Sequence, residues 1–230
     1  MKNFLYSFFL FPMMIYSQPN FEKAEKLYSQ KKYNLAKPLF ENVVKENPNH
    51  LKALEYLGDI EGQLKAWENA MIYYGKLKKL QPSEANFHYK YGGCLGMKAK
   101  EVNKFKALGM ISDIKLSFEK ALELNPKHIE ARWALIQLYI ELPGIVGGSE
   151  RKAQIYANEL LKFSAVDGYL AKGHIAEYFD RYREAEKNYQ KAIQVGGSKH
   201  TYEKLANLYK NKLNQPEKAK DVMDTFSRKG

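Results

Sequence analysis

The chain has 230 residues, of which 37 are Lys or Arg and 26 are Asp or Glu, so its formal net charge is +11. This length accommodates one elongated array with a continuous core, but not a separate catalytic domain beside it. Only five of the basic residues are arginines, the side chain best suited to forked recognition of phosphates and bases. The positive charge therefore favours lysine-rich solvated faces over a nucleic-acid interface.

Residues 1–17 have the pattern of a secretory signal peptide. Lys2 precedes an apolar run from Asn3 to Tyr16, and Ser17 offers a small residue before Gln18. The run is too short to remain as a membrane-spanning anchor. An uncleaved hydrophobic N-terminal helix is the alternative. The signal peptide predicts an exported protein that is periplasmic or extracellular.

The rest of the chain carries a residue pattern that returns every 34 positions. Ala36, Phe40 and Val43 have counterparts in Ala70, Tyr74 and Leu77. Spacings of four and three place these residues on one stripe of a helix, and a proline after each stripe ends that helix. The pattern continues at Phe118, Ala121 and Pro126, at Ala185, Tyr189 and Ala192, and at Ala219, Met223 and Phe226.

A second helix type precedes these stripes, and in three repeats it contains a glycine. The pairs are Leu57-Gly58, Tyr91-Gly92 and Lys172-Gly173. Glycine inside a helix costs about 1 kcal/mol relative to alanine, unless a neighbouring helix needs the space. We therefore expect close contact between the two helices of each repeat.

This pattern resembles the tetratricopeptide repeat family, and the resemblance extends over nearly all of the chain after residue 17. It implies an all-α, right-handed superhelical solenoid of about six helix-turn-helix repeats. The first repeat has Ala24 where the family has glycine, the fourth has Ile136 there, and the fifth stops at Gly196-Gly197. The expected repeats are residues 18–49, 50–83, 84–127 with an insertion, 128–165 with an insertion, 166–199 and 200–230.

The insertion in the third repeat adds about ten residues around Met97 to Gly109. Its apolar residues recur at three-residue steps while its lysines spread to the other side, which is typical of an amphipathic helical extension. A lengthened hairpin arm with a solvated face is one interpretation. The other is a peripheral contact with a membrane surface, made by Lys98, Lys100, Lys104 and Lys106.

The insertion in the fourth repeat is a glycine-rich loop from Glu141 to Glu150. Pro143-Gly144 predicts a turn, and Ser149 before Glu150 predicts an N-cap for the next helix. A phosphate cradle would need a lysine and a hydroxyl in P-loop spacing, which this loop does not have. We expect a shaped loop at the rim of a groove.

In proteins of this family the first helices line the concave surface, so the resemblance implies a binding groove there. Of the residues that helical spacing selects, four are acidic and only Lys204 is basic, so this surface is opposite in sign to the whole chain. Such a groove would bind a protein or peptide segment that has apolar anchors and some positive charge, and would repel nucleic acid. The candidate groove residues are Tyr28, Glu55, Asp59, Tyr89, Trp133, Gln137, His174, Glu177 and Tyr178.

Two features of this groove leave alternatives open. Tyr89 and Trp133 could point into the groove or into the core. Gly93 and Gly96 could leave room for a ligand to approach the backbone, or could serve close packing between repeats.

Catalytic chemistry is not indicated. His174 and Glu177 form the only helical pair of metal-ligand type on the groove, and no third ligand is placed by spacing. Cys94, the single cysteine, excludes an internal disulfide and suits a buried apolar position better than a reactive one. The sequence predicts a non-catalytic interaction scaffold without cofactor or metal. The alternative is a periplasmic solute-binding or transport-accessory protein that encloses a small ligand.

Overall fold

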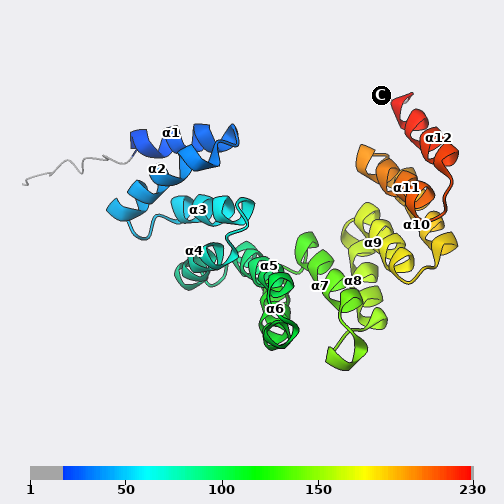
Figure 1. The fold of residues 1–230 in the computed structure, drawn as a ribbon, viewed down its shortest axis with the longest axis horizontal. Helices are drawn as coiled ribbons and strands as arrows, with labels where there is room; N and C mark the ends of the chain where they lie inside the picture. Colours follow the sequence, from blue (N-terminus) through cyan, green and yellow to red (C-terminus); the bar gives the residue numbers. More distant parts are fainter. Residues whose placement is uncertain (1–17, 229–230) are drawn as a thin grey trace, which may run out of the picture. The chain divides into compact units, whose positions relative to one another are not determined.

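The computed structural model describes residues 18–228, and the signal peptide predicted for residues 1–17 lies outside them. Within the described residues the chain forms twelve α-helices, one short 3-10 helix and no strand (Figure 1). The predicted all-α helical repeat solenoid is therefore confirmed. The chain divides into two compact units, residues 18–80 and residues 81–228, which are described separately.

The helices form consecutive antiparallel pairs, each with a first and a second helix. In the N-terminal unit they are α1 (Gln18–Ser29), α2 (Tyr33–Glu46), α3 (Leu51–Gln63) and α4 (Trp67–Leu80). In the C-terminal unit they are α5 (Ala85–Glu101), α6 (Lys104–Leu124), α7 (Ile129–Glu141), η1 (Gly144–Val146), α8 (Glu150–Phe163), α9 (Ala165–Tyr178), α10 (Tyr182–Gly196), α11 (Lys199–Asn211) and α12 (Pro216–Ser227).

A glycine of the first helix packs against a side chain of the second helix in three hairpins, as the sequence predicts. A Cβ atom placed on Gly58 would lie 2.8 Å from the ring of Tyr74, and one on Gly92 would lie 2.8 Å from Ser117. A Cβ atom on Gly173 would lie at well under van der Waals distance from the ring of Tyr189. The glycines therefore allow a helix-helix approach that no other residue permits.

The core of the N-terminal unit is built from the periodic stripe. Ala36, Phe40 and Val43 of α2 are buried against Leu57 of α3. Phe40 also stacks on Tyr56, with ring centroids 4.7 Å apart and planes 16° apart. Within this unit, α2 thus buries its apolar face against α1 of its own hairpin and against α3 of the next one.

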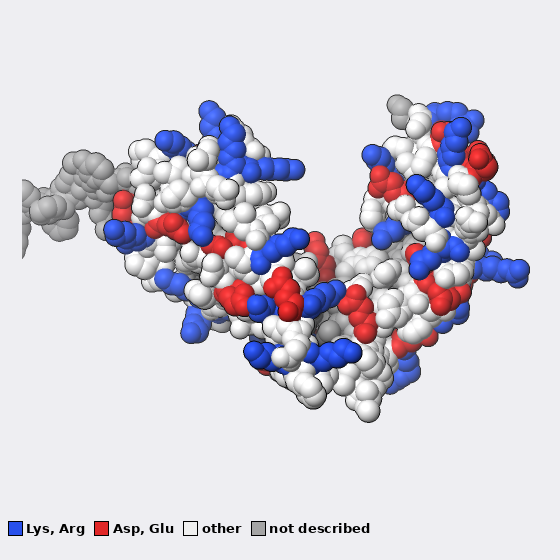
Figure 2. All heavy atoms as spheres, viewed as in Figure 1, with Lys and Arg blue, Asp and Glu red and all other residues white. Residues whose placement is uncertain are grey.

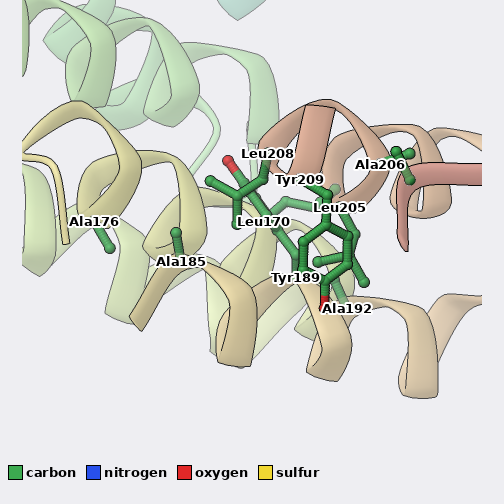
Figure 3. Packing of buried hydrophobic residues seen from close by; sticks show 10 residues of the cluster. Leu170, Ala176, Ala185, Tyr189, Ala192, Leu205, Ala206, Leu208 and Tyr209 are labelled. Atoms are coloured by element: carbon green, nitrogen blue, oxygen red, sulfur yellow. The ribbon is translucent and has the colours of Figure 1, made fainter. Parts of the chain in front are cut away.

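The core of the C-terminal unit continues the same arrangement over three successive helices. Figure 3 shows the rings of Tyr189 and Tyr209 among leucine and alanine side chains of α9, α10 and α11. Tyr189 is fully buried, and its hydroxyl donates a 2.7 Å hydrogen bond to Glu177 of α9. Cys94 is also buried, which agrees with its expected apolar role.

Histidines cap two of the first helices. The Nδ1 atom of His50 accepts a hydrogen bond from the backbone N–H of Ala53 at 3.2 Å, and Nδ1 of His128 accepts one from Ala131 at 3.3 Å. Each bond satisfies a backbone donor that the first turn of a helix leaves free. The recurrence of histidine at repeat starts is therefore a structural device.

Two glycines in first helices should respond oppositely to the same substitution. Gly173→Ala should lower the free energy of unfolding by about 1–3 kcal/mol, because the new methyl group overpacks the buried Tyr189 ring. Gly93→Ala should raise it by up to about 1 kcal/mol, since a Cβ there has no atom within 4 Å and alanine favours the helix. Urea unfolding followed by circular dichroism measures both, and equal effects would contradict the packing described for Gly173.

Candidate partner-binding surface

The two insertions lie beside one another in the C-terminal unit. Both fall between the first and second helix of a hairpin, the first at the α5–α6 turn and the second at the α7–α8 connection. In a stack of hairpins the turns of this type all lie along one edge. Figure 1 shows the two insertions at the lower edge of the C-terminal unit. Consecutive hairpins therefore bring the two insertions together.

The first insertion forms a lengthened hairpin arm. It extends α5 to 17 residues and α6 to 21, with Asn103 capping α6 by accepting a 3.0 Å hydrogen bond from the backbone N–H of Lys106. The arm exposes apolar side chains: Phe105 is 87% exposed and Leu108 is 46% exposed. The first residues of α6 thus lie beyond the normal length of a hairpin, and they carry exposed apolar side chains.

The second insertion is a loop that is pinned to the end of α7. Gly147 has a φ of +100°, and a Cβ on Gly148 would collide with the carbonyl oxygen of Leu142. The N–H of Ser149 donates a 2.8 Å hydrogen bond to the carbonyl of Tyr139, and its hydroxyl caps α8 as predicted. The loop is therefore held as a fixed wall beside α6.

An apolar pocket of about 540 Å³ lies where α5, α6, α7 and this loop meet. Two of its wall positions are Gly93 and Gly96 of α5. A Cβ on Gly93 would meet no atom within 4 Å, so this glycine leaves open space and does not serve close packing. Its apolar lining includes Ile111, Ile114, Ala134, Leu138 and Val146.

A second pocket of about 490 Å³ adjoins the first on the side of α8. We call the two pockets together the insertion groove. Lys115 and Lys152 line the second pocket, while Lys100, Lys104 and Glu141 line the first. Both pockets share five residues, which are Leu108, Ile111, Leu138, Leu142 and Val146.

A chain of polar contacts runs along the wall of the first pocket. Lys100 Nζ lies 3.2 Å from Glu141, whose carboxylate accepts a 2.5 Å hydrogen bond from the side-chain amide of Gln137. The amide oxygen of Gln137 lies 2.9 Å from Nε2 of His174 on α9. Figure 2 shows that the lower edge of the C-terminal unit is mostly uncharged, with positively charged side chains beside it. The groove is thus apolar inside and charged along its margin.

His174 is held in its neutral form by its surroundings. Burial lowers its pKa below the ordinary value of 6.5, and the positive charge of Lys204 lowers it further. Glu177 and Glu141 act in the opposite direction but do not compensate. With neutral imidazole, the contact with the oxygen of Gln137 makes Nε2 the protonated nitrogen.

Three of the predicted groove residues lie together in the C-terminal unit. Trp133 and Gln137 of α7 face His174 of α9, with the Trp133 and His174 ring centroids 6.2 Å apart. The indole N–H of Trp133 donates a 3.1 Å hydrogen bond to Asp167, and its ring packs against the core. Trp133 therefore has a packing role at the edge of the core, and Gln137 is the member of this trio that lines the pocket.

The other predicted residues of this unit are Tyr89, Glu177 and Tyr178. Tyr89 is half-buried, with its ring centroid 5.0 Å from that of His128 and its pKa raised by burial. Glu177 accepts the hydrogen bond of Tyr189 inside its own hairpin. Tyr178 is 45% exposed at the end of α9.

In the N-terminal unit, Tyr28 belongs to an aromatic cluster. Its ring centroid lies 4.7 Å from that of Tyr56 and 5.5 Å from that of Tyr33. Burial, together with the negative charge of Asp59, raises the pKa of Tyr28 to about 12. The ring is half-buried, and it packs against the core of its unit.

The predicted acids of the N-terminal unit already have internal partners. Asp59 accepts a 2.5 Å hydrogen bond from the hydroxyl of Tyr74 on α4. Glu55 forms an ion pair with Lys52, one turn earlier on the same helix, at 2.9 Å. Asp59 and Glu55, like Glu177 with Tyr189, therefore form contacts that hold their own helix or hairpin together.

Spacing on the first helices found Gly93, Gly96 and Gln137 among the residues of the insertion groove, but none of the others. A signal was nevertheless present in the sequence. Two consecutive repeats each depart from the period between their first and second helices, and turns of this type share one edge of the stack. That coincidence would have predicted contact between the insertions.

No group of described residues is suited to hold a metal ion. Among the described helices, none has the length and apolar character needed to cross a membrane.

Family models for the tetratricopeptide repeat match residues 21–85 and residues 166–195. No match was found among curated proteins.

Several solved structures share the fold at low sequence identity. A thermophilic tetratricopeptide repeat protein of Thermus thermophilus is 17% identical, with a TM-score of 0.63 over 90% of this chain and 98% of that one. PilW, a widely conserved type IV pilus biogenesis factor, is 15% identical, with a TM-score of 0.66 over 92% of each chain. YrrB, described as having an unusual peptide-binding site, is 16% identical, with a TM-score of 0.54 over 80% of this chain and 89% of that one.

The lowered pKa of His174 predicts a loss of stability in mild acid. The unfolded chain takes up a proton at this residue below about pH 6.5, whereas the folded chain resists it, so the free energy of unfolding should fall as pH decreases from 7.5 to 5. His174→Gln should flatten this dependence relative to the unchanged protein, by at most about 1.4 kcal/mol per pH unit. Urea unfolding at several pH values measures the difference. Parallel pH profiles for the two proteins would contradict the assignment.

Proposed function

Because this chain is a tetratricopeptide repeat protein, we propose that it is a non-catalytic interaction scaffold that binds a segment of a partner protein. The fold supports this proposal, since stacked hairpins present an extended surface without a catalytic centre of their own. YrrB, a protein of the same fold, is likewise described as having a peptide-binding site.

The observation that carries the proposal is the open apolar pocket beside Gly93 and Gly96. Both glycines lie on the first helix of a hairpin, and α7, which supplies Ala134 and Gln137, is the first helix of the next. Binding sites are typically apolar hollows with a few polar groups at defined places, as here. The proposed binding surface is therefore the part of the first-helix face that opens into the insertion groove.

A small-ligand function is the second candidate, and the pocket volume favours it. About 540 Å³ falls within the range of about 300–1,000 Å³ that is usual for small-molecule sites. The pocket, however, continues into a second one along exposed apolar side chains, and such an extended surface suits a polypeptide better. Thermal-shift screening of metabolites separates the two, because only a small-ligand protein should be stabilised by a metabolite alone.

Filling the pocket should abolish partner capture without unfolding the chain. Gly93→Leu places a side chain in the open space and improves helix propensity, so the melting temperature should be equal or higher while capture falls by at least about tenfold. Chemical crosslinking followed by pull-down from envelope extracts measures capture, in keeping with the export proposed from residues 1–17.

Gly109→Leu is the matched control for this experiment. Gly109 lies on α6, also has no atom within 4 Å of an added Cβ, and is not part of the pocket lining. This variant should retain capture. If Gly93→Leu captured the same proteins as the unchanged chain, the binding surface would lie elsewhere.

A further inference from the structure

The floor of the insertion groove is a continuous apolar strip. The five residues shared by its two pockets come from α6, from α7 and from the pinned loop, and Leu108 among them is 46% exposed. An amphipathic helix places side chains at i, i+4 and i+7 on one face, so that successive anchors can enter adjoining pockets. The form of the groove therefore suits a helical segment better than a single compact ligand.

The charge around the groove is predominantly positive. Lys100, Lys104, Lys115 and Lys152 line the two pockets, and Glu141 is the one carboxylate among the lining residues. Glu141 is engaged by Lys100 and by Gln137. Lys104 and Lys115 form no ion pair with any residue that the structure describes. Two lysines are thus available to a ligand.

The acidic residues that the sequence analysis assigned to a groove do not change the positive charge around the insertion groove. Asp59 and Glu177 accept hydrogen bonds from tyrosine hydroxyls within their own hairpins, and neither lines the groove. A partner that approaches the groove meets lysines at its margin and apolar side chains inside. Complementarity therefore calls for a negatively charged partner, opposite to the one that the sequence pattern favoured.

An anionic membrane is the competing partner for the same chemistry. Phe105 is 87% exposed and Ile145 is 95% exposed, and both are beside residues that line the groove. The pockets, however, are recessed between helices, where only an occupant with projecting side chains can enter. The recessed pockets favour a protein helix over a bilayer.

Resting on the function proposed above, we propose that the insertion groove binds an acidic amphipathic helix of a partner protein. The apolar face of that helix occupies the two adjoining pockets. Its carboxylates face Lys104 and Lys115. The two insertions thus form a charge-selective site that the regular repeats do not contain.

A pair of synthetic helical peptides tests the proposal with the full chain. Each has about 18 residues, or five turns, with leucines at i, i+4 and i+7, and its polar face carries either glutamates or lysines. Fluorescence anisotropy should show the glutamate peptide binding at least about tenfold tighter than the lysine peptide at about 0.05 M salt, with a smaller ratio at about 0.5 M. Gly93→Leu should weaken the binding of the glutamate peptide by a similar factor.

Charge reversal identifies the lysines responsible. Lys104→Glu combined with Lys115→Glu should remove or invert the preference for glutamate. Lys187→Glu combined with Lys210→Glu changes the net charge equally on exposed faces of α10 and α11 and should leave the preference intact. Equal affinity for the two peptides, or a preference that survives the first double variant, would overturn the proposal.

Two further results separate the alternatives. The chain could bind phosphatidylglycerol vesicles more tightly than the glutamate peptide and lose this binding in the Phe105→Ser, Ile145→Ser double variant. That result would overturn the proposal in favour of a membrane surface. If Gly93→Leu abolished partner capture while the peptides showed no charge preference, the scaffold function would stand and the acidic helix would be wrong.

Discussion

The close approach of a glycine in one helix to a side chain in the next is the constraint on which three of the described hairpins depend. Gly58 meets Tyr74, and Gly173 meets Tyr189, at distances that leave no room for a methyl group. This approach places the tyrosine hydroxyl within reach of an acid on the first helix, Asp59 in one hairpin and Glu177 in the other. Packing and hydrogen bonding therefore fix the helix pair together, and the pair is the unit that stacks.

The candidate site arises where this regular scheme is interrupted. The arm extends α6 past the length that the stack can cover, and the loop after α7 is pinned beside it by Gly148 and Ser149. Apolar side chains that a regular repeat would bury are left lining a groove. A repeat scaffold is stable through its interfaces, so it can carry such an addition at one edge without losing its core.

The distribution of charge follows from the same division between regular and inserted parts. Carboxylates within the hairpins are held by tyrosines and lysines, for example Asp59 by Tyr74 and Glu55 by Lys52. Lysines of the inserted segments are left at the margin of the groove. The net charge of the chain therefore indicates the sign of this surface better than the residues chosen by spacing on the first helices.

The sequence alone determined the helix pairs, the buried stripe and the packed glycines, because helical periodicity fixes which side chains share a face. Only the tertiary structure decided what each face meets. Gly92 and Gly93 are neighbours in the sequence, yet Gly92 packs against Ser117 and Gly93 opens into the pocket. Successive residues of an α-helix are rotated by about 100° about its axis, so adjacent glycines lie on different faces. Contact between the two insertions likewise depends on the stacking of one hairpin on the next, which is a property of the assembled fold.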